Sequence, residues 1–194
     1  MAETTRQKQR TGSLLVLLVA ITVINALLSR FAVVAWPDAP GVSSVYFAVA
    51  FMIPFTLWFG AWGAVSAYVA CVIGAGLPWV PLGVNLYWSL ADLWQVLIPL
   101  VAFKRLHAYA GLRTLRDLVV FFVFGWLLNN LAGALWGSTM LSVGGVLPRS
   151  EVPGTFVSWL VSNLIVTLAI SVLLLKYATP LLVQRDLLIG GYWS

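Results

Sequence analysis

The sequence predicts an all-α, polytopic membrane protein that crosses the bilayer with six transmembrane helices. The chain of 194 residues is 61% hydrophobic and only 9% charged, whereas a soluble domain is typically about 45–50% apolar and about 25% charged. Its apolar runs are long and lack the alternation of a β-strand, so helices have to satisfy their backbone hydrogen bonds within the bilayer. These observations exclude a soluble globular domain and a disordered chain. Residues 1–194 fit a single transmembrane helical domain.

A helix that crosses the hydrocarbon core needs about 20 apolar residues. The stretch 43–77 contains no charged residue and is too long for one crossing. We divide it at residues 60–63, Gly-Ala-Trp-Gly, because glycine allows a tight turn. Interpreting 43–77 as one tilted helix plus a loop would instead leave five spans. The six expected spans are residues 13–36, 43–59, 61–77, 86–103, 117–141 and 155–176.

The basic residues orient these spans. If the N-terminus is inside, Arg30 and Arg149 face outward and the other nine Lys and Arg residues face the cytoplasm, out of eleven in the chain. This bias matches the positive-inside rule and predicts that both termini are cytoplasmic. A five-span arrangement would place one of the basic clusters outside, which favours six. We therefore expect a multi-pass protein of the cell membrane (inner or plasma).

Three outer loops are expected at 37–42, 78–85 and 143–154. All are rich in proline and glycine, which favours ordered turns over helices. Several tryptophans fall near the same outer boundary, where an interfacial aromatic belt is one explanation for them. The segment 177–194 follows the last span and is expected on the inner membrane surface.

Polar side chains recur at membrane depth in the last three spans. Asp92 is the one acid inside a span, where insertion of a charge costs roughly 2.5–3.5 kcal/mol, and such residues usually face a partner or a cavity. A few polar groups among aromatic walls are typical of a small-molecule pocket. The alternative is that these groups only bond neighbouring helices. The predicted substrate-binding residues are Trp88, Asp92, Gln95, Asn129, Asn130, Trp159 and Asn163.

Enzyme motifs are absent from the sequence. It contains no P-loop, HExxH, CxxC or GxSxG pattern, and a single histidine, His107, and a single cysteine, Cys71, cannot form a multi-histidine metal site or a disulfide. We therefore expect a protein that is not an enzyme and has no cofactor or metal site. Because its cations flank the spans instead of forming a stripe, we expect no nucleic-acid partner.

The stretch Leu57-Trp58-Phe59-Gly60-Ala61-Trp62-Gly63-Ala64 resembles the Phe-Gly-x-x-Gly turn between the second and third helices of S components of energy-coupling-factor (ECF) transporters. The stretch 88–105 and the closing helix with Asn163 are also similar. The resemblance implies that the outer halves of the last three helices hold a vitamin or metal, near Asp92, Asn129, Asn130 and Asn163. It also implies a transmembrane coupling subunit and ATPase subunits as partners.

Two other classes of function stay open. The segments 115–122 and 159–180 resemble MASE-type membrane sensor domains, which implies signalling through another chain. The GxxxG pattern of Gly133 and Gly137 permits close helix approach and would also suit a structural accessory subunit of a larger membrane complex.

We predict that positions 8 and 109 are cytoplasmic and that position 150 is outside. Single cysteines at these positions, in a chain whose Cys71 is replaced by alanine, should react with an impermeant reagent from outside only at 150. Labelling of position 109 from outside would contradict the six-span topology.

Overall fold

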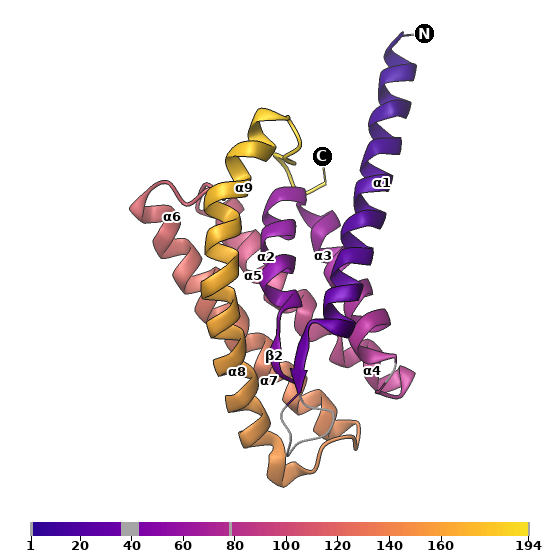
Figure 1. Cartoon of the computed structure of the whole chain (residues 1–194), viewed down its shortest axis with the longest axis vertical. Helices are drawn as coiled ribbons and strands as arrows, with labels where there is room; N and C mark the ends of the chain where they lie inside the picture. The colour runs from indigo at the N-terminus through magenta and orange to yellow at the C-terminus, as the bar shows by residue number, and fades with distance from the viewer. Residues whose placement is uncertain (1, 36–42, 78, 194) are drawn as a thin grey trace.

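The structure, a computed structural model, describes residues 2–35, 43–77 and 79–193, with side chains from 15–32, 45–77 and 79–193, and it is mostly helical (Figure 1). In the first half, helix α1 leads into an antiparallel two-stranded ribbon in which Val33 pairs with Tyr46. The elements are α1 (Ala2–Phe31), β1 (Val33–Ala35), β2 (Ser43–Tyr46), α2 (Ala48–Phe59), α3 (Ala61–Ala70) and the π-helix η1 (Cys71–Gly76).

The second half forms longer helices that run through short π-helical segments. Three continuous helices are long and apolar enough to cross a membrane: Leu82–Arg105 with 24 residues, Leu115–Val143 with 29 and Arg149–Gln184 with 36. Shorter apolar helices occupy Leu15–Phe31, Ala48–Phe59 and Ala61–Gly76. The elements of this half are α4 (Leu82–Trp88), α5 (Leu90–Arg105), α6 (Leu115–Val120), η2 (Phe121–Leu128), α7 (Asn129–Val143), the 3₁₀ turn η3 (Arg149–Glu151), α8 (Val152–Val166), η4 (Thr167–Ser171) and α9 (Val172–Gln184).

The predicted helical class is confirmed, and the three long helices are consistent with a membrane protein. Two predicted spans were wrong at one end each, because 13–36 ends in a strand and 43–59 begins with one. β-branched and aromatic residues favour strands, and Val33, Val34, Val45 and Tyr46 pair their backbones across the ribbon. The expected loop 37–42 lies outside the described residues.

Two further boundaries differ from the prediction. Residues 82–85 were expected in a turn but begin helix α4, since Pro81 stands at the N-cap position and its carbonyl accepts from the Asn85 backbone N–H at 2.8 Å. The segment from 177 was expected on the membrane surface, yet α9 continues the last helix to Gln184.

Helix α2 lies at the centre of the bundle, between α1 and α3 on one side and the long helix α8–η4–α9 on the other (Figure 1). Nearly all its residues are buried. The outer helices instead expose large apolar side chains, as expected of a surface covered by lipid. On α1 and α8 these are Leu15, Val16, Val19, Val23, Ile24, Leu27, Phe31, Val157, Val161 and Ile165.

The C-terminal segment 187–193 folds back over the turn between α2 and α3. The Ala61 N–H donates to the Tyr192 carbonyl at 2.6 Å, and the Ile189 N–H donates to the Trp58 carbonyl at 2.8 Å. Gly60, between the two helices, has φ +62, and a Cβ there would lie 2.3 Å from the Tyr192 oxygen. Glycine is therefore required at this turn by its backbone angles and by the segment that covers it.

We predict that Gly60→Ala lowers the melting temperature of the detergent-solubilised protein. Such a backbone conformation costs a residue with a Cβ about 1–3 kcal/mol, and the Cβ also displaces Tyr192. Gly190→Ala is the matched control, because a Cβ there meets nothing within 4 Å. Equal melting temperatures for the two variants would contradict this account of the turn.

Candidate functional site

The seven predicted site residues lie on α4–α5, α7 and α8, and α7 packs antiparallel against the other two. Asp92, Gln95, Asn129, Asn130 and Asn163 are at most 2% exposed, while Trp88 and Trp159 are half-buried. The two tryptophans lie toward the end of the bundle that carries β2 and the 144–151 turn, opposite the end that carries the C-terminus (Figure 1).

A polar bridge joins the three helices in the middle of the bundle. The Gln95 amide Nε2 donates to Asn130 Oδ1 at 2.8 Å. Asn130 Nδ2 in turn donates to the Trp126 carbonyl at 2.7 Å and to Thr167 Oγ1 at 3.3 Å. Gly133 permits this approach, because a Cβ there would lie 2.3 Å from Gln95 Cδ. The bridge therefore fixes α5, α7 and the start of η4 at one level.

The two tryptophans pack together nearer to the end of the bundle. Trp88 and Trp159 meet edge to face with ring centroids 6.1 Å apart. Trp159 also lies against Gly137, where an added Cβ would come within 2.3 Å of its ring. A small apolar cluster covers the pair and includes Val80, Leu141 and Leu147. The tryptophan pair and this cluster together close the end of the three-helix region.

Asn163 lies between these two levels. Trp159, Asn163 and Thr167 are spaced by four residues and share a helix face; Trp159 contacts Gly137 of α7 and Thr167 contacts Asn130. Asn129 likewise shares the face of α7 that carries Gly133 and Gly137. Both asparagine side chains are fully buried.

Five of the seven predicted residues carry buried polar atoms that have no hydrogen-bond partner within the described part of the chain. Buried polar groups are normally paired, so each exception needs a physical reason. Seven such atoms occur here: Trp88 Nε1, Gln95 Oε1, Asn129 Nδ2 and Oδ1, Trp159 Nε1, and Asn163 Nδ2 and Oδ1. Both ends of each asparagine amide are unpaired, so the result holds whichever way the amides are turned.

Asp92 belongs to a different network. Its Oδ2 accepts a hydrogen bond from the Tyr46 hydroxyl at 2.8 Å. Ser29 Oγ lies 2.7 Å from the same hydroxyl, and since the tyrosine has one hydrogen, the serine donates there. This chain ties α1, β2 and α5 together. Sequence reasoning missed Tyr46; its phenolic hydroxyl at the start of the uncharged stretch 43–77 was the only signal.

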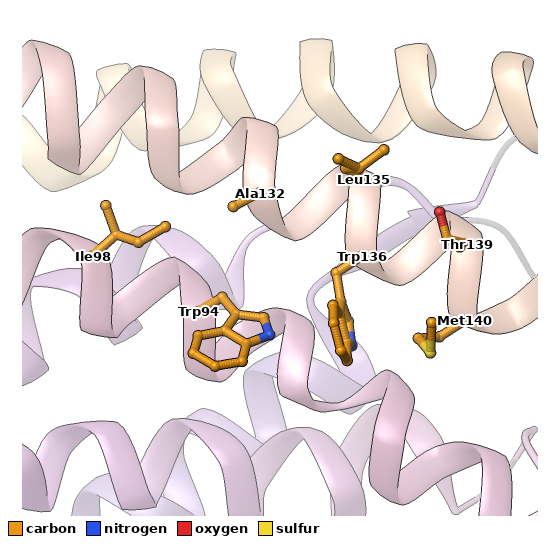
Figure 2. A pocket seen from close by; sticks show the side chains of 7 residues that line it. All are labelled: Trp94, Ile98, Ala132, Leu135, Trp136, Thr139 and Met140. Atoms are coloured by element: carbon orange, nitrogen blue, oxygen red, sulfur yellow. The ribbon is translucent and has the colours of Figure 1, made fainter.

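A shallow groove of about 570 Å³ lies along α5 and α7 (Figure 2). Trp94 and Trp136 form its wall with their rings edge to face at 6.0 Å. The seven predicted site residues do not line it, and its other residues are Ile98, Ala132, Leu135, Thr139 and Met140. It is almost wholly apolar, and Leu135 is 59% exposed there, so it belongs to the outer surface of the bundle.

Comparison with protein-family models, with curated proteins and with solved structures gives no match.

We predict that Tyr46→Phe lowers stability by about 1–3 kcal/mol, because Asp92 and Ser29 then lose a buried partner. Asp92→Asn should hold the melting temperature, since the amide oxygen still accepts from Tyr46. Tyr87→Phe is the control, with a side chain 65% exposed. The melting temperatures of the three variants are compared by thermal unfolding in detergent. A Tyr46→Phe protein as stable as Tyr87→Phe would show that this hydrogen bond contributes nothing.

Proposed function

We propose that the protein is a membrane-embedded subunit that binds a small molecule between α5, α7 and α8, as the S component of a vitamin or micronutrient importer does. The observation that carries the proposal is the set of seven unpaired polar atoms on five residues of facing helices. Leaving a buried donor or acceptor unpaired costs about 1–3 kcal/mol. A bound molecule that pairs with these atoms would recover that cost.

The position of the set supports entry from the outer side. In the six-span topology with both termini inside, α5 and α8 run inward from the outer surface and α7 runs outward, so Trp88 and Trp159 lie nearest to the outside. Figure 1 supports this topology: the C-terminus and the start of α6 lie at one end, and β2 and the 144–151 turn lie at the other. Small movements of the tryptophan pair and its apolar cluster would then open the region.

The partners follow from the same proposal. The sequence contains no nucleotide-binding motif, so ATP hydrolysis would belong to separate ATPase subunits. A transmembrane coupling subunit would transmit the conformational change driven by ATP hydrolysis to this chain. The lipid bilayer covers the remaining apolar surface, including the groove along Trp94 and Trp136. The chain itself acts as a binding protein and not as an enzyme.

We predict that Asn163→Leu abolishes binding while stability holds or rises. Replacing an unpaired buried amide by an apolar side chain of similar size removes a desolvation cost. Thr56→Val is the matched control, because Thr56 Oγ1 is also buried and unpaired but lies on α2, against Gly63 of α3. Native mass spectrometry of gently extracted protein should find a small molecule on the wild type and on Thr56→Val, and none on Asn163→Leu.

Two results would contradict the proposal. One is loss of folding in Asn163→Leu with normal folding in Thr56→Val, which would make Asn163 a structural residue. The other is wild-type protein that carries no small molecule and is extracted with a kinase or a large complex, which would favour the sensor or the accessory subunit.

A further inference from the structure

We propose that the site between α5, α7 and α8 takes an uncharged, planar molecule that has both hydrogen-bond donors and acceptors along its edge. This inference rests on the proposed function and specifies the chemistry of its ligand. It follows from which atoms of the site are unpaired, which charged groups are already engaged, and which surfaces enclose the region.

The unpaired atoms all belong to neutral groups. Two are indole N–H donors, of Trp88 and Trp159. The remaining five are amide atoms of Gln95, Asn129 and Asn163, which comprise two NH₂ donors and three carbonyl acceptors. A ligand that satisfies this set needs acceptors as well as donors. An amide, a lactam or a ring nitrogen beside an N–H has that combination in one plane.

Within the described part of the chain, Asp92 is the one charged residue of α4, residues 90–103, α7 and α8. The Asp92 carboxylate accepts from Tyr46, on the side of α5 that faces β2 and α1, and neither of its oxygens is in the unpaired set. Lys104 donates to the Ile189 and Gly190 carbonyls at the far end of the bundle. Arg30 lies over the Trp79 ring, 5.2 Å from its centroid. A charged ligand would therefore be buried here without an opposite charge, which is unfavourable by several kcal/mol.

The enclosing surfaces favour a flat molecule. Gln95 packs against Gly133 and the Trp159 ring packs against Gly137, so the helices lie too close together for a bulky molecule, and the Trp88 and Trp159 rings close one end. Aromatic rings pack well in stacked or edge-to-face arrangements against indoles. The indole N–H groups would then donate to a carbonyl or ring nitrogen at the edge of the molecule, while Asn129 and Asn163 pair with both its donors and its acceptors.

The test uses three probes of one shape and different charge: benzamide, which is neutral, benzoate, an anion, and benzamidine, a cation. Each is titrated into detergent-solubilised protein, from which any retained molecule has been washed, while melting temperature and tryptophan fluorescence are followed. The naphthalene-2-carboxamide, carboxylate and carboxamidine series repeats the comparison with a larger ring. We expect one of the two amides to raise the melting temperature, with at least tenfold weaker binding of its charged counterparts. The effect should disappear in Asn163→Leu and persist in Thr56→Val.

Three outcomes would overturn the inference: tighter binding of an amidine, lost in Asp92→Asn; tighter binding of a carboxylate; or no response to either amide at millimolar concentration. Native mass spectrometry separates this failure from failure of the proposed function. A charged molecule retained by the wild type and lost in Asn163→Leu overturns the ligand class and leaves the binding function standing. If the wild type retains no molecule and responds to no probe, both the ligand class and the proposed binding function are overturned.

Discussion

The close approach of α5 and α8 to one face of α7 is the contact on which the rest of the structure depends. At Gly133 and Gly137 an added Cβ would lie 2.3 Å from Gln95 and from Trp159, respectively. Small residues in apolar helices allow this kind of packing. Without it, Gln95 would not reach Asn130, and Trp159 would not lie beside Trp88. The glycine face thus aligns the polar bridge and the tryptophan pair and holds Asn163 between them.

Two polar networks meet at α5, and they differ in whether all their groups have hydrogen-bond partners. On one face Asp92, Tyr46 and Ser29 fasten the ribbon and α1, and every group named has a partner. On the other face Gln95 joins the bridge to Asn130 through its NH₂ group and leaves its carbonyl unpaired. Paired networks rigidify a fold, whereas partly paired ones are costly unless something completes them. This difference separates the scaffold side of α5 from the proposed binding side.

Composition and periodicity were sufficient for the helical class, since apolar runs without alternation leave no other means of satisfying the backbone. They failed at the ribbon, because a strand of three or four residues is too short to show a period beside long apolar helices. The sequence predicted Asp92, Asn129 and Asn163 at similar depth in the membrane, but depth does not reveal toward which neighbouring helix a side chain points. Asp92 turns toward Tyr46, a long-range contact that one helix's spacing cannot predict. The groove at Trp94 and Trp136 was not anticipated either, since its lining is ordinary apolar sequence.

The π-helical segments give the polar bridge a mechanical role. Asn130 follows the end of η2 and Thr167 begins η4, so their hydrogen bond joins two helices where each changes its winding. A π turn uses i→i+5 hydrogen bonds and holds an extra residue. Were such a turn to revert to α-helix, everything beyond it would rotate by about 100° per residue, the angular step of an α-helix. The bridge therefore fixes the angular register of α7 relative to α6, and of α8 relative to α9.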